Sequence, residues 1–241
     1  MKIALSELDR IRFGITVAKA ALDAKDDVDA IMKWCGDNKV KMLIARCACE
    51  DIQITQKLEA FNSYLMDTLV YFQNKRIVAA ENLLDGRYSW RIATESDADM
   101  VEELAGEVFE GYSGHYHADS RLNKKDSDLV YSSWAKNSCY GGSFSDVVFL
   151  ILYDEKIVGF LTVKKQDPTS CEIILNGVSP RHQNNGLYSF LVSLTKNWAL
   201  NQKIKTVTIS TQITNIAVQK VWCRQGFEPL KSYYTFHKWF N

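Results

Sequence analysis

The spacing of apolar and polar residues predicts helices alternating with strands along the first part of the chain. A helix is expected over residues 27–36, because Asp27 can cap its N-terminus and Gly36 can end it. Runs rich in β-branched and aromatic residues predict strands. In this part the expected strands cover 13–18, 40–48 and 64–73, and a second helix covers 52–60.

This rhythm breaks at turn-forming residues around 73–76 and 84–87 and restarts at Tyr88. The sequence therefore predicts a domain boundary near residue 86, with a smaller α/β domain in 1–86 and a second domain in 87–241. The fold class is α/β with a mixed sheet. The second domain is expected to contain strand 88–93, helices 97–109 and 126–137, hairpin strands 147–153 and 156–165, strand 171–178, helix 187–200, strand 205–211, a helix from 215 and two closing strands.

Composition narrows the classes of partner. The chain has 241 residues, 46% of them hydrophobic, and its 29 basic residues equal its 29 acidic ones. A balanced charge argues against a nucleic-acid or membrane-surface partner and favours small molecules. No apolar run approaches the ~20 residues of a membrane span, so a cytoplasmic location is expected. The six cysteines lack the spacing of zinc ligands, and no metal is expected.

Residues 178–188 form the segment around which the rest is organised. They read as the end of a strand, a polar turn and the start of a helix, since Pro180 cannot continue a strand and Gly186 allows unusual backbone geometry. The N-terminus of a helix binds anions through its free amides and its dipole. Arg181 adds a cation beside that terminus, so the sequence predicts a site for a pyrophosphate.

Two motifs in this half resemble those of GCN5-related N-acetyltransferases. The turn 183–188 resembles the family's Q/R-x-x-G-x-G/A sequence, and 215–227 resembles its N-x-x-A-x-x-x-Y-x-x-x-G-F element. The resemblance implies the acyl-coenzyme A N-acyltransferase fold over about the last 155 residues, with acetyl-coenzyme A as co-substrate. The residues that it places at acetyl-coenzyme A are Leu175, Asn176, Val178, Arg181, Gln183, Asn184, Asn185, Gly186, Leu187, Tyr188, Asn215 and Trp222.

The chain departs from the family pattern where a proton donor is expected. Trp222 replaces a tyrosine that protonates the leaving thiolate in many relatives, and an indole cannot do this. Tyr234 in the last expected strand is the preferred substitute and Cys223 ranks below it. Reprotonation by water or by the amine's own proton is the alternative. Gly177 is expected to ease a bulge in the strand before the turn.

The loop 111–121 is the best candidate for the acceptor side, because it is glycine-flanked and rich in aromatic and titratable residues. His115 is a candidate base that accepts a proton from the acceptor's ammonium group. Arg121 is a candidate partner for an acceptor phosphate. His117 is placed with them on the acceptor side, although a plain surface loop would also explain the His-x-His pattern.

Two further segments, 61–71 and 131–134, resemble the TDP-fucosamine N-acetyltransferases. This resemblance implies an acceptor amine on a nucleotide-linked amino-dideoxy sugar, with residues 1–86 helping to shape the acceptor side. A homodimer is among the expected assemblies. The alternatives are acetylation of another small amine, and a non-catalytic domain that binds or senses acyl-coenzyme A.

Overall fold

The computed structural model describes residues 2–80 and 84–241. Ten strands form one mixed sheet in the order β1-β2-β3-β10-β4-β9-β8-β7-β6-β5, in which β2 with β3 and β8 with β9 are parallel pairs. The strands are β1 (Lys2–Leu5), β2 (Val17–Leu22), β3 (Met42–Ala48), β4 (Tyr64–Asn74), β5 (Tyr88–Ile92), β6 (Val147–Tyr153), β7 (Lys156–Asp167), β8 (Ser170–Val178), β9 (Thr206–Gln212) and β10 (Glu228–Trp239).

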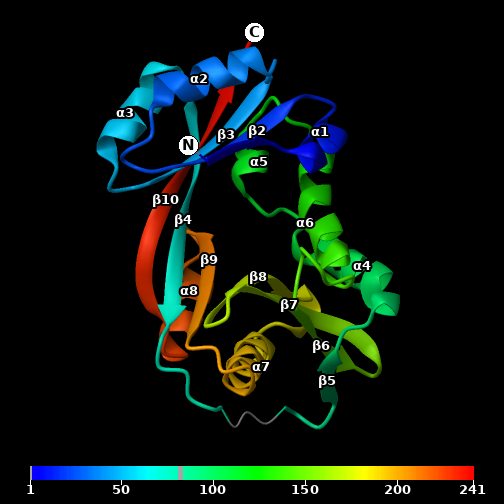
Figure 1. The fold of residues 1–241 in the computed structure, drawn as a ribbon. Helices are drawn as coiled ribbons and strands as arrows, with labels where there is room; N and C mark the ends of the chain where they lie inside the picture. Colours follow the sequence, from blue (N-terminus) through cyan, green and yellow to red (C-terminus); the bar gives the residue numbers. More distant parts are fainter. Residues whose placement is uncertain (1, 81–83) are drawn as a thin grey trace.

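The helices cover both faces of this sheet (Figure 1). One face carries α4, α5 and α6, around which the sheet curves, and the other carries α2 and α3 at one end and α7 at the other. The helices are α1 (Glu7–Phe13), α2 (Val28–Asp37), α3 (Ile52–Ala60), α4 (Ala98–Val108), α5 (His115–Ala118), α6 (Lys124–Ser138), α7 (Leu187–Asn201) and α8 (Ile216–Arg224), with 3₁₀ turns η1 (Glu95–Asp97) and η2 (Pro180–His182).

The sheet does not divide at residue 86. Strand β10, near the end of the chain, lies between β3 and β4 of the first part, and β4 in turn pairs with β9. One hydrophobic cluster contains Met42 and Ile44 of β3 together with Leu150 and Phe160 of β6 and β7. The two predicted domains therefore share one sheet and one core.

Local sequence signals such as helix caps account for the bounds of most helices and strands. Asp27 accepts a hydrogen bond from the Asp29 amide at 3.0 Å and starts α2, as its position predicts. The strand expected over 13–18 is wrong, because α1 occupies Glu7–Phe13 and ends at Gly14, whose φ of 66° is the left-handed conformation that stops a helix. Strand β2 follows only from Val17.

The closing part of the chain is one strand instead of the two expected. Strand β10 runs from Glu228 to Trp239, and a register shift between Pro229 and Lys231 absorbs the proline. None of the helices in the described ranges 2–80 and 84–241 is both long and apolar enough to span a membrane.

Candidate active site

Strands β8 and β9 pair at one end and separate at the other. Their last pair is Ile173 with Ile209, while β8 continues to Val178 with β7 as its only strand partner among the residues that the structure describes. The backbone from Ile174 to Val178 therefore presents an open edge toward β9. Such an edge can pair with the amides of an extended ligand. The predicted residues Leu175, Asn176 and Val178 all lie on it.

A bulge lies at the point where the two strands part, but Gly177 does not cause it. The register of β8 against β7 shifts between Ile173 and Leu175, so Ile174 is the extra residue. Gly177 pairs regularly with Phe160. A Cβ atom on Gly177 would lie 2.2 Å from Cγ1 of Val108, so glycine is needed there for the close approach of α4.

The turn that follows β8 has the geometry expected of an anion site. Asn184 and Gly186 have φ of 64° and 74°, and no side chain caps α7. The side-chain amides of Gln183 and Asn185 donate to carbonyls of the turn. Within the described residues, the backbone amides of 183–188 donate no hydrogen bond inside the protein. They remain available to a phosphate at this helix terminus.

The surroundings of the turn leave room for such a ligand. Nothing lies within 4 Å of a Cβ atom built on Gly186. Arg181 is exposed beside it. The side chain of Tyr188 packs against the hydrophobic core under α7.

Trp222 pairs with Tyr188 inside that core. Trp222 is 1% exposed, and its ring meets that of Phe72 edge-on with the centroids 5.3 Å apart. Its indole N–H donates a 2.7 Å hydrogen bond to the Tyr188 hydroxyl. Trp222, where the chain departs from the family pattern, therefore has its indole N–H satisfied by Tyr188. Burial raises the pKa of Tyr188 far above its ordinary value. Neither side chain lines the cavity described next.

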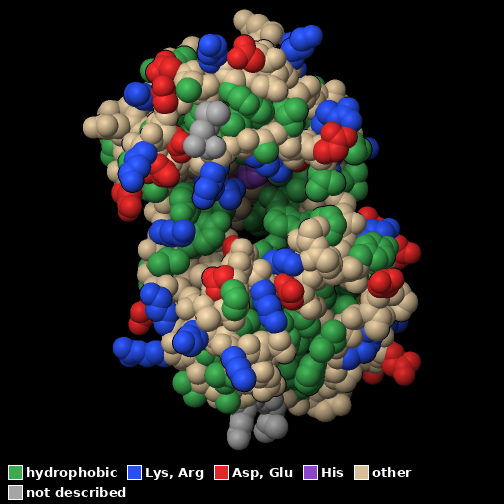
Figure 2. All heavy atoms as spheres, in the orientation of Figure 1, with side chains coloured by type: hydrophobic (Ala, Val, Ile, Leu, Met, Phe, Trp, Pro, Cys, Tyr) green, Lys and Arg blue, Asp and Glu red, His purple; other side chains and the backbone are tan. Residues whose placement is uncertain are grey.

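A cavity of about 870 Å³ lies between the two parts of the chain. Figure 2 shows it as a hollow at the waist of the molecule, with a histidine side chain visible inside. Its walls come from α1, β2, β3 and β4 on one side and from α5, α6, β8 and β9 on the other. Ile174 and Leu175 of the open edge are among the lining residues, so the cavity meets the split between β8 and β9.

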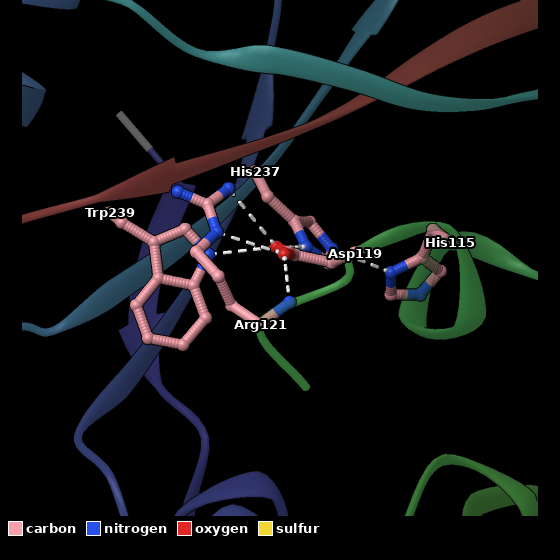
Figure 3. A network of polar contacts seen from close by, with 5 residues as sticks. All are labelled: His115, Asp119, Arg121, His237 and Trp239. Carbon is pink, nitrogen blue, oxygen red and sulfur yellow. Dashed lines mark hydrogen bonds and ion pairs between the residues drawn. The ribbon is translucent and has the colours of Figure 1, made fainter. Parts of the chain in front are cut away.

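His115 lines this cavity and begins a chain of buried hydrogen bonds (Figure 3). Its Nδ1 lies 2.9 Å from Nε2 of His237, and Nδ1 of His237 lies 2.9 Å from a carboxylate oxygen of Asp119. Asp119 also accepts hydrogen bonds from the Trp239 indole at 2.7 Å and the Arg121 guanidinium at 2.9 Å. His237 is fully buried and Asp119 is 3% exposed.

The environment fixes the charge of the two ends of this chain. Burial alone would raise the pKa of Asp119, but the hydrogen bonds from His237, Arg121 and Trp239 outweigh it and lower that pKa far below its ordinary value. Asp119 is therefore a carboxylate. Removal from water lowers the pKa of His115 well below its ordinary value, and the nearby His237 and Arg46 lower it further. His115 is therefore a neutral imidazole at pH 7.

The cavity also contains Asp67, a carboxylate that has no hydrogen-bond partner among the described residues. Asp67 of β4, Thr235 of β10 and Arg46 of β3 lie in one row across three adjacent strands. Nε of Arg46 donates to Oγ1 of Thr235 at 3.3 Å. Both carboxylate oxygens of Asp67 are buried and accept no hydrogen bond from the described residues. A buried carboxylate without a donor is costly unless a ligand supplies one.

Two tyrosines face this carboxylate. Burial raises the pKa of Tyr112 to about 12 and raises that of Tyr131 further, and the negative charge of Asp67 adds to both shifts. The Tyr112 hydroxyl donates to the side chain of Gln212 at the end of β9. Both phenols therefore stay protonated and line the cavity as hydrogen-bonding groups.

The structure does not place Tyr234 at the cavity. Neighbouring residues of a strand point to opposite faces, and Thr235 and His237 take the face with the cavity. Tyr234 lies on the other face with Phe236, against the core formed with α2 and α3. It is not among the residues that line the cavity.

Two other predicted acceptor residues point away from the cavity. Arg121 is held by Asp119, and its guanidinium stacks over Trp239 at 4.9 Å. His117 pairs with Asp128 at 2.9 Å. Asn215 precedes α8 as predicted, but its side chain donates to Thr211 of β9 at 3.2 Å and does not cap the helix.

Sequence reasoning missed the deeper members of the site: Asp119, His237, Asp67 and Arg46. One signal for His237 was present. In the segment 233–237 the polar side chains of Thr235 and His237 alternate with the aromatic rings of Tyr234 and Phe236. This alternation separates a polar face from an aromatic one, and the prediction chose the aromatic face.

The open strand edge and the free amides of the turn are features that suit an acyl-coenzyme A, and the cavity adjoins the edge. Residues 107–227 match the acetyltransferase (GNAT) family, so the chain belongs to that family. The residues fit acetyl-coenzyme A, the family's co-substrate: the turn would hold its pyrophosphate and the edge of β8 its pantetheine arm. That molecule supplies the activated acetyl group.

Known proteins support this assignment. The chain is 25% identical over 143 residues to the spore coat polysaccharide biosynthesis protein SpsD of Bacillus subtilis, a match that covers 59% of this chain and 48% of SpsD. The chain thus spans about half the length of that relative.

Solved structures show the same fold. A GCN5-related N-acetyltransferase from Sphaerobacter thermophilus superposes with a TM-score of 0.61 at 12% identity, over 88% of this chain and 66% of that one. A tandem GNAT protein from the clavulanic acid biosynthesis pathway superposes with a TM-score of 0.62 at 11% identity, over 87% of this chain and 67% of that one.

Proposed function

We propose that this acetyltransferase moves acetyl from acetyl-coenzyme A to the amine of a nucleotide-linked amino-dideoxy sugar. The observation that carries the proposal is the charge distribution in the cavity. Arg12 of α1 and Arg46 of β3 both line it, and neither forms an ion pair with the described carboxylates. A guanidinium matches the geometry of phosphate oxygens. These two residues would receive the phosphates of the acceptor.

Asp67 would receive the amine. Its carboxylate is the unpartnered acceptor of the same cavity, and an ammonium group supplies the donors that it lacks. A volume of about 870 Å³ lies within the range of small-molecule sites and accommodates a nucleotide with one sugar. The relative SpsD, a protein of polysaccharide biosynthesis, supports a sugar acceptor.

His115 would act as the base. Its ring is neutral at pH 7 and lines the cavity near the open edge of β8. The amine must lose a proton before it attacks the thioester, and an imidazole is suited to accept it. With Tyr234 on the far face, the leaving thiolate takes its proton from the attacking amine, which was the alternative left open by the sequence.

The test is release of coenzyme A thiol. Acetyl-coenzyme A is supplied with a nucleotide-linked amino-dideoxy sugar, with the corresponding free amino sugar, with simple amines, or with no acceptor. Release that is fastest with the nucleotide-linked acceptor supports the proposal. Equal rates with the free sugar or with simple amines would favour another small amine, and no release despite bound acetyl-coenzyme A would indicate a non-catalytic binding domain.

Substitution of the cavity arginines tests the phosphate contacts. Arg46→Gln should lower kcat/KM for the nucleotide-linked acceptor by about 10- to 100-fold, the effect of losing one or two hydrogen bonds to a charged group. The free sugar should be affected much less. Arg10→Gln is the matched control, because Arg10 is exposed on α1 and already paired with Glu7. A uniform loss for both acceptors would contradict the phosphate role.

A further inference from the structure

The hydrogen bonds from Asp119 to His115 determine which ring nitrogen of His115 carries its proton. The Asp119 carboxylate can only accept, so Nδ1 of His237 donates to it. A neutral imidazole has a single N–H, and Nε2 of His237 is then an acceptor. With a neutral His237, the 2.9 Å contact with His115 requires the proton on Nδ1 of His115, whereas a cationic His237 would instead donate to that nitrogen. Nε2 of His115 is left with a free lone pair.

A lone histidine at this place would be a poor base. Its ring lies against that of Tyr116, with the centroids 3.9 Å apart and the planes tilted by 36°, and the surroundings add positive charge. The titratable and charged groups around it are Lys19 from β2, Arg46 from β3, Asp67 from β4, His237 from β10, and Tyr116, His117 and Asp119 from its own segment. A proton taken up by His115 would leave an imidazolium in a buried site, facing the cations Lys19 and Arg46.

The second histidine removes this difficulty. If the Nδ1 proton of His115 moves to Nε2 of His237, the positive charge comes to lie on His237. There it directly contacts the ionised Asp119 at 2.9 Å. A buried ion pair with this geometry, and with Trp239 and Arg121 satisfying the remaining lone pairs, is a better location for the charge.

We propose that His237 and Asp119 are positioning residues that set the tautomer of His115 and receive the positive charge formed when His115 deprotonates the acceptor amine. In this step one N–H bond of the substrate ammonium breaks and the Nε2–H bond of His115 forms. The Nδ1–H bond of His115 breaks as the Nε2–H bond of His237 forms. The freed amine then displaces the thiol from the acetyl group, and its second proton leaves with the sulfur.

This inference rests on the proposed function for its chemistry, but its first test needs no substrate. The chain contains four histidines, so the ring nitrogens can be resolved by ¹⁵N NMR of the full chain. Near neutral pH, we expect His115 and His237 both as Nδ1–H tautomers with unprotonated Nε2. We call the transfer of the proton from His115 to His237 the relay. A resting His115 that carries its proton on Nε2, or a His237 that is cationic at the pH of activity, would overturn the relay.

Variants then test the link between tautomer and rate. Asp119→Asn can donate to Nδ1 of His237 and so invert both rings, as in the Ser-His-Asp template. We expect a loss of about 10²-fold or more in kcat with unchanged affinity for acetyl-coenzyme A. The NMR spectrum should show Nε2–H on His115. An inverted tautomer with unchanged kcat would contradict the proposal.

The pH profile separates this role from a merely structural one. Activity requires unprotonated His115, so kcat/KM falls as the pH falls through the pKa of the histidine pair. His237→Gln removes the site that stabilises the positive charge. The acid limb of the kcat/KM profile should therefore move to lower pH, and the plateau value of kcat/KM should drop. His117→Gln is the matched control, since His117 lies in the same loop but pairs with Asp128. An unmoved limb in His237→Gln would overturn the relay.

The two proposals can fail independently. If no nucleotide-linked amino sugar is acetylated, the proposed function fails, while the tautomers and the shift of the acid limb with the true acceptor still test the relay. If the sugar is acetylated but His115 is an Nε2–H tautomer, only the relay fails.

Discussion

Replacement of Gly186 by aspartate should weaken acetyl-coenzyme A binding severely and leave the fold intact. The position has a φ of 74°, which costs most residues about 1–2 kcal/mol, although Asp and Asn adopt it more readily. No atom lies within 4 Å of the new Cβ. A carboxylate at the start of α7 also stabilises the helix by about 0.3–1 kcal/mol. The free energy of unfolding should therefore change by less than about 2 kcal/mol.

The effect on binding is larger because the charges repel. At about 5 Å and an effective dielectric constant between about 20 and 80, one carboxylate opposes each phosphate charge by about 1–3 kcal/mol. Two phosphate charges then correspond to a loss of about 30-fold or more in affinity. Titration calorimetry measures this directly, and the loss should shrink at higher ionic strength.

Gly186→Asn is the matched control for this experiment. It has the same shape and the same backbone cost without the charge, so its affinity should fall by less than about fivefold. An unchanged Kd in folded Gly186→Asp, or equal losses in both variants, would refute the placement of the pyrophosphate at this turn.

Three further predictions follow from packing. Tyr234→Phe should change kcat by less than about twofold, since the ring faces α2 and α3; a 10²-fold loss in steady-state assays would return Tyr234 to the mechanism. Gly177→Ala should destabilise the fold by about 1–3 kcal/mol in thermal unfolding, and Val108→Ala in the same chain should recover part of it; no recovery would contradict the contact. Tyr188→Phe should cost about 1–3 kcal/mol in denaturant unfolding by leaving the Trp222 indole without a partner, and an unchanged midpoint would show that this bond contributes little.

Local signals in the sequence were enough to predict the strand, turn and helix of residues 171–200. The segment 178–188 combines a strand end, a glycine and a helix start, and the backbone geometry of its turn is set by near neighbours. Helix α2 and the hairpin of β6 and β7 were predicted for the same reason. Propensity and capping act between near neighbours, so a sequence read in order contains that information.

The hydrogen-bond chain at the cavity could not be predicted in this way, because it is assembled from distant segments. Asp119, His237 and Trp239 meet only because β10 lies between β3 and β4. Alternation in 233–237 indicated two faces but not which of them would meet the cavity. The pairing of β4 with β9 and β10 across residue 86 was hidden for the same reason, since turn residues mark the end of an element and not the end of a sheet.

The position of β10 also governs how the chain can fold. Strands β3 and β4 are synthesised early, yet the strand that joins them is synthesised after nearly all the others. Until then both present unpaired edges, which are templates for aggregation. Contacts so distant in sequence make folding slow, and the first part cannot mature on the ribosome as an independent domain would. The nascent chain therefore depends on protection of those edges until residues 228–239 have emerged.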